Sequence, residues 1–291
     1  MRYRFTARVK KAYSVKLLCQ LLGVSRSGFY DFLRREKGDP HPEHEEKLEM
    51  VKKLAEASEH TYGSRRMSRA LRLLGYDVGR HQACSLMREA GVWVRYRRRY
   101  RVTTNSNHRQ PVFENRLERD FSVDAPDHVW AGDITYVWTT QGWLYLAVVI
   151  DLYSRKVVGW SMGRRLTSSL VCDALQMAMW RRRPPERQLI HHSDRGVQYA
   201  SRPFRKLLKT HGIEGSMSRK GDCWDNAVVE SFFGTLKCER VHWRSYQTRE
   251  EARADIVEYI TMFYNSRRLH SYLGYQSPDD FERNGQMADA A

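Results

Sequence analysis

The hydrophobic pattern of the chain changes at about residue 125, and this change constrains the fold more than any other feature. Two β-rich runs, at 128–138 and 143–151, are joined by the turn sequence TTQG, and a third run follows at 155–161. Helical and strand-like patterns then alternate in the order TSSLVCDALQMAMW, RQLIHH, SRPFRKLLKTHG, GIEGSM and DNAVVESFFGTLKCERV. Three antiparallel strands followed by alternating helices and strands predict a layered α/β core over residues 125–240.

The pattern before this point is helical. Residues 14–35 predict two short helices around a tight turn, with Gly23 ending the first helix and Ser25 capping the second. This layout is typical of a helix-turn-helix, which presents the first turn of its second helix to the major groove, although any helical hairpin can show it. We therefore predict a helix-turn-helix DNA-binding module at residues 1–38. Three residues on the outer face of its second helix are predicted to contact DNA: Arg26, Ser27 and Tyr30.

A second helical, DNA-binding module is predicted at residues 44–102. A charged amphipathic helix at 44–58 precedes a helix–turn–helix pair at 63–90. The segment VRYRRRYR at 94–101 then places arginines beside tyrosines, which suits a DNA-tracking arm but also a solvated basic linker. The predicted DNA-contacting residues of this module are Arg65, Arg66, Arg95, Arg97, Arg98 and Arg99.

Two further segments complete the predicted organisation. Residues 103–124 are predicted to be a linker, and residues 241–291 a helical C-terminal extension. Thr248 and Glu251 have the spacing of a capping box, which predicts a helix from there to about Tyr264.

The charge distribution indicates the partner. The chain has 50 Lys and Arg against 34 Asp and Glu, a formal net charge of +16 at pH 7. Residues 1–115 hold 25 basic and 12 acidic side chains, whereas residues 116–291 hold 25 and 22. A polyanion is therefore attracted mainly to the N-terminal part, with salt-sensitive affinity. We predict that the partner is double-stranded DNA; the alternative is a generally basic surface without a specific role.

Other classes of protein are not indicated. No stretch approaches 18 consecutive apolar residues, and the basic N-terminus is not followed by the apolar segment of a signal peptide. We therefore predict no membrane partner and a cytoplasmic location. The five cysteines lie far apart and form no CxxC pair, so neither a disulfide framework nor a zinc ribbon is expected.

Three acidic residues lie where an α/β fold of this kind can gather them. Asp133 is in the middle of the first strand, Asp194 directly follows the strand LIHHS, and Glu230 lies in the long helix. An acid in an aromatic-rich strand is costly to bury unless it is paired or binds a cation. Three carboxylates suit two Mg²⁺ or Mn²⁺ ions, which can activate a hydroxyl and stabilise the leaving oxygen of a phosphoryl displacement. Lys237, on the helix face of Glu230, is predicted to contact DNA phosphate.

Four segments together carry a resemblance to a known family: WAGDITY, HSDRGVQY, GDCWDNAVVESFFGTLKCE and YNSRRLHSYLGYQSP. The sequence resembles the OrfB-type transposases of the IS-three family of bacterial insertion sequences, relatives of retroviral integrases with a ribonuclease-H-like core. In that family the catalytic acids have the D,D(35)E spacing, and here 35 residues separate Asp194 from Glu230. The resemblance implies that Asp133, Asp194 and Glu230 are the catalytic, metal-binding acids. Upstream, LGVSRSGFY and YGSRRM resemble the family's DNA-binding modules.

The resemblance also implies an activity and partners. It implies binding to the terminal inverted repeats of a mobile element, followed by metal-dependent strand cleavage and transfer through a circular donor intermediate. It further implies a homo-oligomer on paired DNA ends, a fusion with an upstream OrfA product, and association with the nucleoid. The start at Met1 fits the OrfB product alone.

Alternative interpretations remain at this stage. Taken singly, each of the three acids has a structural interpretation, and the whole chain is compatible with a catalytically inactive DNA-binding regulator or a simple ribonuclease-H-type nuclease. Asp151, Asp222 and Asp225 are interpreted as acids outside the catalytic set, and His191 and His192 as supports of the strand end. Arg267, Arg268 and His270 suit either DNA contact or packing.

Overall fold

The structure is a computed structural model and describes residues 2–36, 42–95, 113–117, 123–184, 189–218 and 226–289. The chain divides into two compact units, Met1–Trp93 and Val94–Ala291, which we describe separately. None of the helices within the described ranges combines the length and the apolar character needed to cross a membrane.

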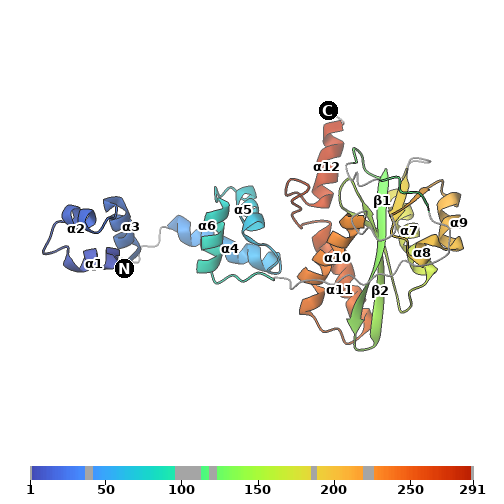
Figure 1. Cartoon of the computed structure of the whole chain (residues 1–291), viewed down its shortest axis with the longest axis horizontal. Helices are drawn as coiled ribbons and strands as arrows, with labels where there is room; N and C mark the ends of the chain where they lie inside the picture. Colours follow the sequence, from blue (N-terminus) through green and yellow to red (C-terminus); the bar gives the residue numbers. More distant parts are fainter. Residues whose placement is uncertain are drawn as a thin grey trace. The chain divides into compact units, whose positions relative to one another are not determined.

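Three helices open the first unit: α1 (Arg2–Val9), α2 (Val15–Leu21) and α3 (Arg26–Glu36) (Figure 1). Gly23 has φ +62°, as expected for a residue that ends a helix, and the Ser25 hydroxyl accepts a hydrogen bond from Gly28 N at 3.1 Å. The predicted pair of helices is thus confirmed. The sequence did not predict α1, whose Tyr3 ring lies 5.8 Å from the ring of Phe32 and helps to cover the fully buried Phe29.

Three more helices follow in the same unit: α4 (Pro42–Ala57), α5 (Ser64–Leu73) and α6 (Arg80–Glu89). They agree with the predicted helix and helical pair, and they pack on one another. Their shared core consists of apolar side chains at helical spacing, among them Val51, Met67, Leu71, Ala83 and Leu86. Because this core is small and faces inward, most basic residues of these helices remain on the surface.

A five-stranded mixed sheet forms the centre of the second unit. Its strands are β1 (Val129–Thr139), β2 (Gly142–Asp151), β3 (Val157–Gly163), β4 (Ile190–Ser193) and β5 (Glu214–Met217), in the order β3-β2-β1-β4-β5. The first three strands are antiparallel, whereas β4 runs parallel to β1 and β5 parallel to β4. A two-residue loop joins β1 to β2, since Thr139 pairs with Gly142. All five strands were predicted from the sequence.

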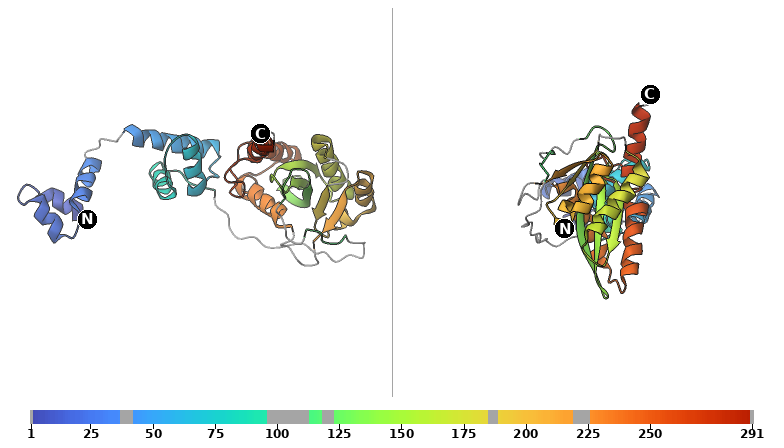
Figure 2. Two further views of the ribbon diagram at one scale, coloured as in Figure 1. Left: turned by 90° about the horizontal axis from the view of Figure 1, so that it is seen from above. Right: turned by 90° about the vertical axis from the view of Figure 1, so that its right-hand side faces the viewer.

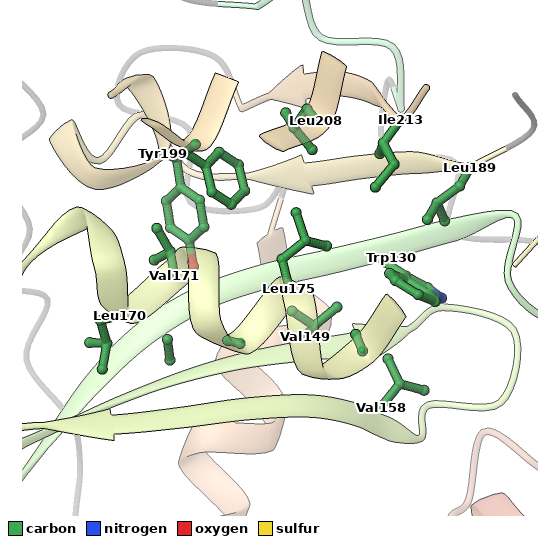
Figure 3. Close-up of a cluster of buried hydrophobic side chains, with 14 of the residues drawn as sticks. Trp130, Val149, Val158, Leu170, Val171, Leu175, Leu189, Tyr199, Leu208 and Ile213 are labelled. Atoms are coloured by element: carbon green, nitrogen blue, oxygen red, sulfur yellow. The ribbon is translucent and has the colours of Figure 1, made fainter. Parts of the chain in front are cut away.

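Helices cover both faces of this sheet (Figures 1 and 2). One face carries α7 (Ser168–Arg182), α8 (Val197–Ala200) and α9 (Arg202–Thr210), and the other carries α10 (Ala227–Glu239) and α11 (Arg249–Glu258). Between α7, α9 and the sheet lies a cluster of buried apolar side chains that includes Trp130, Val149, Leu175, Phe204 and Leu208 (Figure 3). This three-layer arrangement fixes the ends of β1 and β4.

Within the second unit, the C-terminal extension packs on the α/β core through buried polar contacts. After a short 3-10 helix (Val241–Trp243) and α11, the chain forms a π-helix at Tyr259–Tyr264 and ends in α12 (Pro278–Asp289). Glu239 accepts two hydrogen bonds from the Arg268 guanidinium, at 2.8 and 2.7 Å, and one from the Tyr259 hydroxyl at 2.7 Å. The prediction of a helix reaching Tyr264 is right in extent, but the π-helical end was not predicted.

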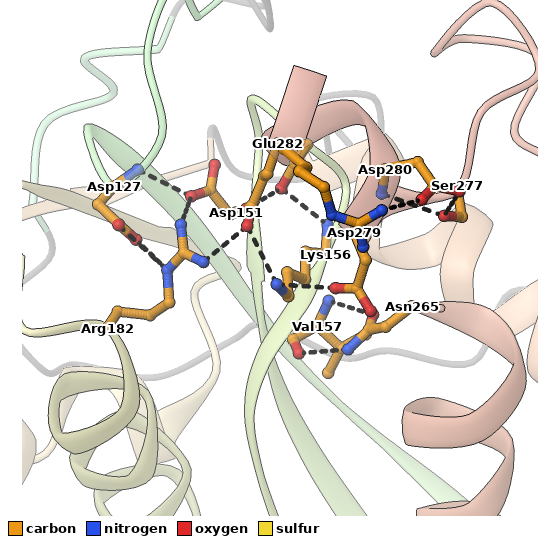
Figure 4. Close-up of polar contacts among 12 residues, drawn as sticks. Asp127, Asp151, Lys156, Val157, Arg182, Asn265, Ser277, Asp279, Asp280 and Glu282 are labelled. Carbon is orange, nitrogen blue, oxygen red and sulfur yellow. Dashed lines mark hydrogen bonds and ion pairs between the residues drawn. The ribbon is translucent and has the colours of Figure 1, made fainter. Parts of the chain in front are cut away.

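A second buried network joins α12 to the sheet (Figure 4). The Arg182 guanidinium donates to Asp127 at 2.8 Å and to Glu282 at 2.8 Å. Lys156 donates to Glu282 at 3.0 Å, and the Ser154 hydroxyl donates to the same carboxylate at 2.7 Å. These partners hold the pKa of Glu282 below its usual range despite burial, which by itself would raise it. The network therefore fastens α12 to the β2–β3 turn and to the end of α7.

Candidate active site

The pairing of β1 with β4 brings two of the predicted catalytic acids together. In this parallel register Gly132 lies opposite Ser193, the last residue of β4. Asp133 and Asp194 each follow one of these two partners in the chain, so they come next to each other at the carboxyl end of β4. Each has a local hydrogen bond that fixes one carboxylate oxygen: Asp133 accepts from Ile134 N at 2.7 Å, and Asp194 from Gly196 N at 2.9 Å.

The third acid comes from α10, which packs against β1. Asn226, at the start of this helix, is buried, and its side-chain nitrogen donates to Gly132 O at 3.3 Å. Glu230 is one helical turn further along the same face and is exposed. The contact of Asn226 therefore ties the turn that carries Glu230 to the strand that carries Asp133.

The charges of the three acids act on one another. Burial raises the pKa of Asp133 well above its usual range, and the charges of Asp194 and Glu230 raise it further. The Ile134 backbone N–H and the charge of Lys237 oppose this rise in the pKa of Asp133. Burial and the charge of Asp194 also raise the pKa of Glu230. Mutual repulsion of this kind is what a bound cation relieves.

Lys237 lies on α10 two turns beyond Glu230. Its ammonium group is 5.0 Å from the centre of the Tyr136 ring, and its charge reaches Asp133. A cation in this position can hold a DNA phosphate near the acids. This position agrees with the predicted contact between Lys237 and DNA, which stays a prediction.

A group of residues behind the two aspartates was not predicted from the sequence. A Cβ atom at Gly132 would lie 2.8 Å from His191 Nε2 and 3.3 Å from the Tyr199 hydroxyl, so only glycine fits here. Tyr199 is buried, and its pKa is raised by burial and by the charges of Asp133 and Asp194. The motif HSDRGVQY contains Tyr199, and this was the available signal, but periodicity alone gives no reason to place α8 beside β1.

The two histidines of β4 are buried in this region. Burial lowers the pKa of His191 to about 3, so its ring is neutral. Neither of its ring nitrogens has a hydrogen-bond partner within the described part of the chain. His192 is also buried and has hydrogen bonds with the hydroxyls of Ser216 at 2.9 Å and Ser218 at 3.3 Å. Both positions agree with support of the strand end.

The donor set suits a hard divalent cation, because all three members are carboxylates. Among the residues that the structure describes, no three histidine, cysteine or acidic side chains are grouped closely enough to hold one metal ion. Asp133 and Asp194 are joined by the strand register, whereas Glu230 is an exposed side chain that acts on them by charge. The three acids thus form a group of interacting negative charges. Their oxygen atoms and their charge suit a hard divalent cation.

The predicted DNA-contacting residues of the first unit have varied environments. Arg26, Ser27, Tyr30 and Arg65 are exposed, whereas Arg66 is half-buried, with its guanidinium 6.0 Å from the centre of the Tyr62 ring. Exposure agrees with the prediction that these residues contact DNA but does not test it.

The predicted arginine arm is described only at its beginning. Arg95 belongs to the second unit, where it donates to Glu239 O at 2.6 Å and lies 5.8 Å from the Trp243 ring. Arg97, Arg98 and Arg99 lie outside the described residues, as do Asp222 and Asp225.

Other residues considered from the sequence have structural environments. Asp151 is fully buried, accepts from Asp127 N and Tyr153 N at 2.8 Å each, and belongs to the network of Arg182. Arg268 and His270 are buried in the C-terminal extension, which favours packing over DNA contact for both. Arg267 is exposed, and its guanidinium donates to Met262 O at 2.6 Å.

Comparisons with known proteins agree with this geometry. Two models of integrase core domains match residues 123–223 and 230–285, and the model of an HTH-like domain matches residues 42–100. The solved HTLV-2 integrase catalytic core domain in complex with magnesium (trimeric form) is 18% identical, with a TM-score of 0.43, and the match covers 55% of this chain and 99% of that chain. The matched core domains and the sheet topology define a polynucleotidyl transferase of the integrase class, with the predicted ribonuclease-H-like fold.

Full-length relatives narrow this class. The chain is 44% identical over 284 residues to the transposase InsF for insertion sequence IS3A of Escherichia coli strain K12. This match covers 97% of this chain and 98% of the relative. It is 45% identical over 273 residues to the uncharacterized 31 kDa protein of insertion element IS600 of Shigella sonnei, with 93% and 100% covered. The chain belongs to the IS-three family of insertion-sequence transposases, and it is a DNA transposase. The resemblance stated from the sequence is confirmed.

Proposed function

We propose that this transposase binds the terminal inverted repeats of its insertion sequence and catalyses strand cleavage and strand transfer with Asp133, Asp194 and Glu230. The observation that carries the proposal is the β1–β4 register, which sets two acids side by side, with the charge of a third acting on both. We propose Mg²⁺ or Mn²⁺, two ions per site, as the cofactor. Bound to these carboxylates, the ions would supply activation of the attacking hydroxyl and stabilisation of the leaving oxygen.

The residues of the chain have distinct roles in this proposal. Asp133 and Asp194 would be ligands of the metal ions, and their local hydrogen bonds orient the carboxylates. Glu230 would supply the third carboxylate ligand. Lys237 contacts a phosphate of the reacting strand and offsets the negative charge of the site.

The parts of the chain divide this work. The proposed modules are a helix-turn-helix at 1–38, a second DNA-binding module at 44–102, a linker at 103–124, the catalytic core at 125–240 and a helical extension at 241–291. The two N-terminal modules recognise the element ends, and the core acts on the strand placed beside it. We propose that the protein works as a homo-oligomer on paired ends, alone or fused to an OrfA product, at the DNA of the bacterial cytoplasm.

Strand transfer by the purified protein tests the proposal. The assay uses an oligonucleotide carrying the element end, a target duplex and Mg²⁺. Asp133→Asn, Asp194→Asn and Glu230→Gln are expected to lower product formation by at least about 10²-fold, since each removes a charged metal ligand. Mn²⁺ binding to the protein without DNA, measured by electron paramagnetic resonance, is expected to weaken in Asp133→Asn and Asp194→Asn.

Matched controls come from exposed acids of the same unit. Asp173, on α7, and Glu250, on α11, are exposed, so Asp173→Asn and Glu250→Gln are expected to keep full activity. Strand joining by folded triad variants would contradict the catalytic assignment. Metal-independent binding to element ends with no cleavage by the wild type would instead favour the inactive-regulator alternative, which the three acids at family spacing argue against.

A further inference from the structure

Three aromatic side chains are exposed together at the β1–β2 hairpin. We call them the hairpin aromatic cluster: Tyr136, Trp138 and Trp143, with exposed fractions of 42%, 59% and 43%. The ring centres of Trp138 and Trp143 are 4.8 Å apart, and those of Tyr136 and Trp143 are 4.9 Å apart, both edge-to-face. Contacting large aromatic side chains that stay in water are typical of a binding surface.

The cluster is linked to the active site through Lys237. Tyr136 follows Asp133 by three residues, about 10 Å along β1, and because side chains alternate along a strand the two point to opposite faces of it. Lys237 connects the two, because its ammonium lies over the Tyr136 ring and its charge reaches Asp133. A DNA strand bound at the acids and at Lys237 would therefore reach the aromatic rings within the length of a few nucleotides.

Positive charge borders the cluster on its other side as well. The Arg249 guanidinium donates to the backbone carbonyls of Trp143 at 3.0 Å and Gln141 at 2.5 Å. These carbonyl partners are neutral, so they leave the charge of Arg249 in place. The rings therefore lie between a lysine and an arginine, and exposed aromatic faces combined with cations are the recognition chemistry of single-stranded nucleic acid.

We propose that the hairpin aromatic cluster stacks unpaired nucleotides of the DNA end held in the active site. The bases of an intact duplex are already stacked on their neighbours, so the rings can accept only bases that have separated from the complementary strand. The cluster thereby holds a frayed end next to Asp133 and favours the opened form of the DNA. The proposal rests on the proposed function only in naming the DNA end as ligand.

Binding without divalent metal tests this proposal apart from catalysis. Two labelled oligonucleotides carry the same element end, one fully paired and one with three unpaired terminal nucleotides. The wild type is expected to bind the unpaired end more tightly. Trp138→Ala combined with Trp143→Ala is expected to weaken binding of the unpaired end about tenfold, with little change for the paired end, since stacking on one aromatic ring contributes about this much per base.

Two variants serve as controls. Trp180, on α7, is 72% exposed and lies outside the cluster, so Trp180→Ala should bind both oligonucleotides as the wild type does. Trp138→Phe keeps an aromatic face and should retain most of the preference for the unpaired end. A 2-aminopurine among the unpaired nucleotides should lose fluorescence on binding to the wild type, because stacking quenches it, and keep its fluorescence with the double variant.

Other outcomes overturn the proposal. Equal binding of both oligonucleotides by the wild type would show that the rings do not read unpaired bases. A double variant with unchanged DNA affinity but a smaller sedimentation coefficient would show that the cluster joins two copies of the chain. If strand transfer fails while the preference for unpaired ends persists, the proposed function is wrong and the stacking surface stands.

Discussion

The two units of this transposase place their charged side chains differently. In Met1–Trp93 ion pairs lie at the surface, as in Arg72–Asp77 at 3.8 Å and Lys53–Glu49 at 4.0 Å. In Val94–Ala291 several arginines are buried with their partners, as in Arg268–Glu239 and Arg240–Asp255. The count of basic residues in a sequence therefore does not give the charge offered to DNA, because part of it neutralises acids inside the fold.

The largest expected effect comes from breaking a buried pair. Arg268→Met leaves the Glu239 carboxylate buried with the Tyr259 hydroxyl but without its guanidinium, which should destabilise the second unit by about 3–5 kcal/mol. Urea unfolding followed by circular dichroism measures the change. Arg72→Gln is the counterpart in the first unit, where the pair is exposed, and should cost less than about 1 kcal/mol. Similar losses for both variants would remove the contrast between the units.

A smaller effect should follow from pH in the second unit. Burial, with the charge of Asp127, raises the pKa of Asp151 from its ordinary 3.8 to about 7, against the opposing hydrogen bonds from backbone N–H groups and the charge of Arg182. The folded state therefore binds a proton that the unfolded state releases, so this group's contribution to stability is greatest below about pH 4 and is lost as the pH rises to about 7.

Asp151→Asn removes this dependence. The free energy of unfolding of the variant minus that of the wild type should increase by a few kcal/mol from pH 4 to pH 7. Urea unfolding at a series of pH values measures this difference. Glu282, whose pKa is lowered, acts in the opposite sense and loses its contribution as the pH falls below its ordinary value. A difference between variant and wild type that is independent of pH would show that Asp151 is already ionised in the folded protein at pH 4.

The smallest expected effect concerns DNA affinity of the first unit. Arg26→Gln and Arg65→Gln remove exposed cations, so each should weaken binding to the element ends and reduce the slope of log affinity against log salt by about one. Stability should change by less than about 0.5 kcal/mol. Lys53→Gln, on α4 and paired with Glu49, is the matched control outside the predicted contact face. An unchanged salt slope in Arg65→Gln would exclude a phosphate contact at that position.

The sequence predicted those parts of the fold that depend on local pattern. Alternating and helical apolar spacing was sufficient for the five strands and for α7, α9 and α10. Ser201 caps α9, with Phe204 N donating to its hydroxyl at 3.4 Å. One half of the predicted capping box is present, because Thr248 accepts from Glu251 N at 3.1 Å; Glu251 accepts instead from Gln247 N, at 2.8 Å, one residue before the cap. The acids Asp133, Asp194 and Glu230 followed from these elements and from the family spacing.

Features that depend on contacts between distant segments were not predictable in this way. The helix α1 was missed because only Thr6 of its residues is buried, which leaves almost no apolar periodicity. Tyr199 comes beside Asp133 only through the packing of α8 against the sheet. Arg182 joins Asp127, 55 residues before it, to Glu282, 100 residues after it. A sequence pattern records the spacing of residues along one element, and it contains no distances between elements.

The backbone pairing of Gly132 with Ser193 has a consequence for how such enzymes can diverge. Hydrogen bonds between two parallel strands, and not the length of the intervening chain, determine how far Asp133 lies from Asp194. Insertions or deletions in the connection between β3 and β4 can therefore accumulate without separating these two side chains. A shift of β4 by a single residue along β1, in contrast, would turn its side chains to the opposite face and separate the pair at once.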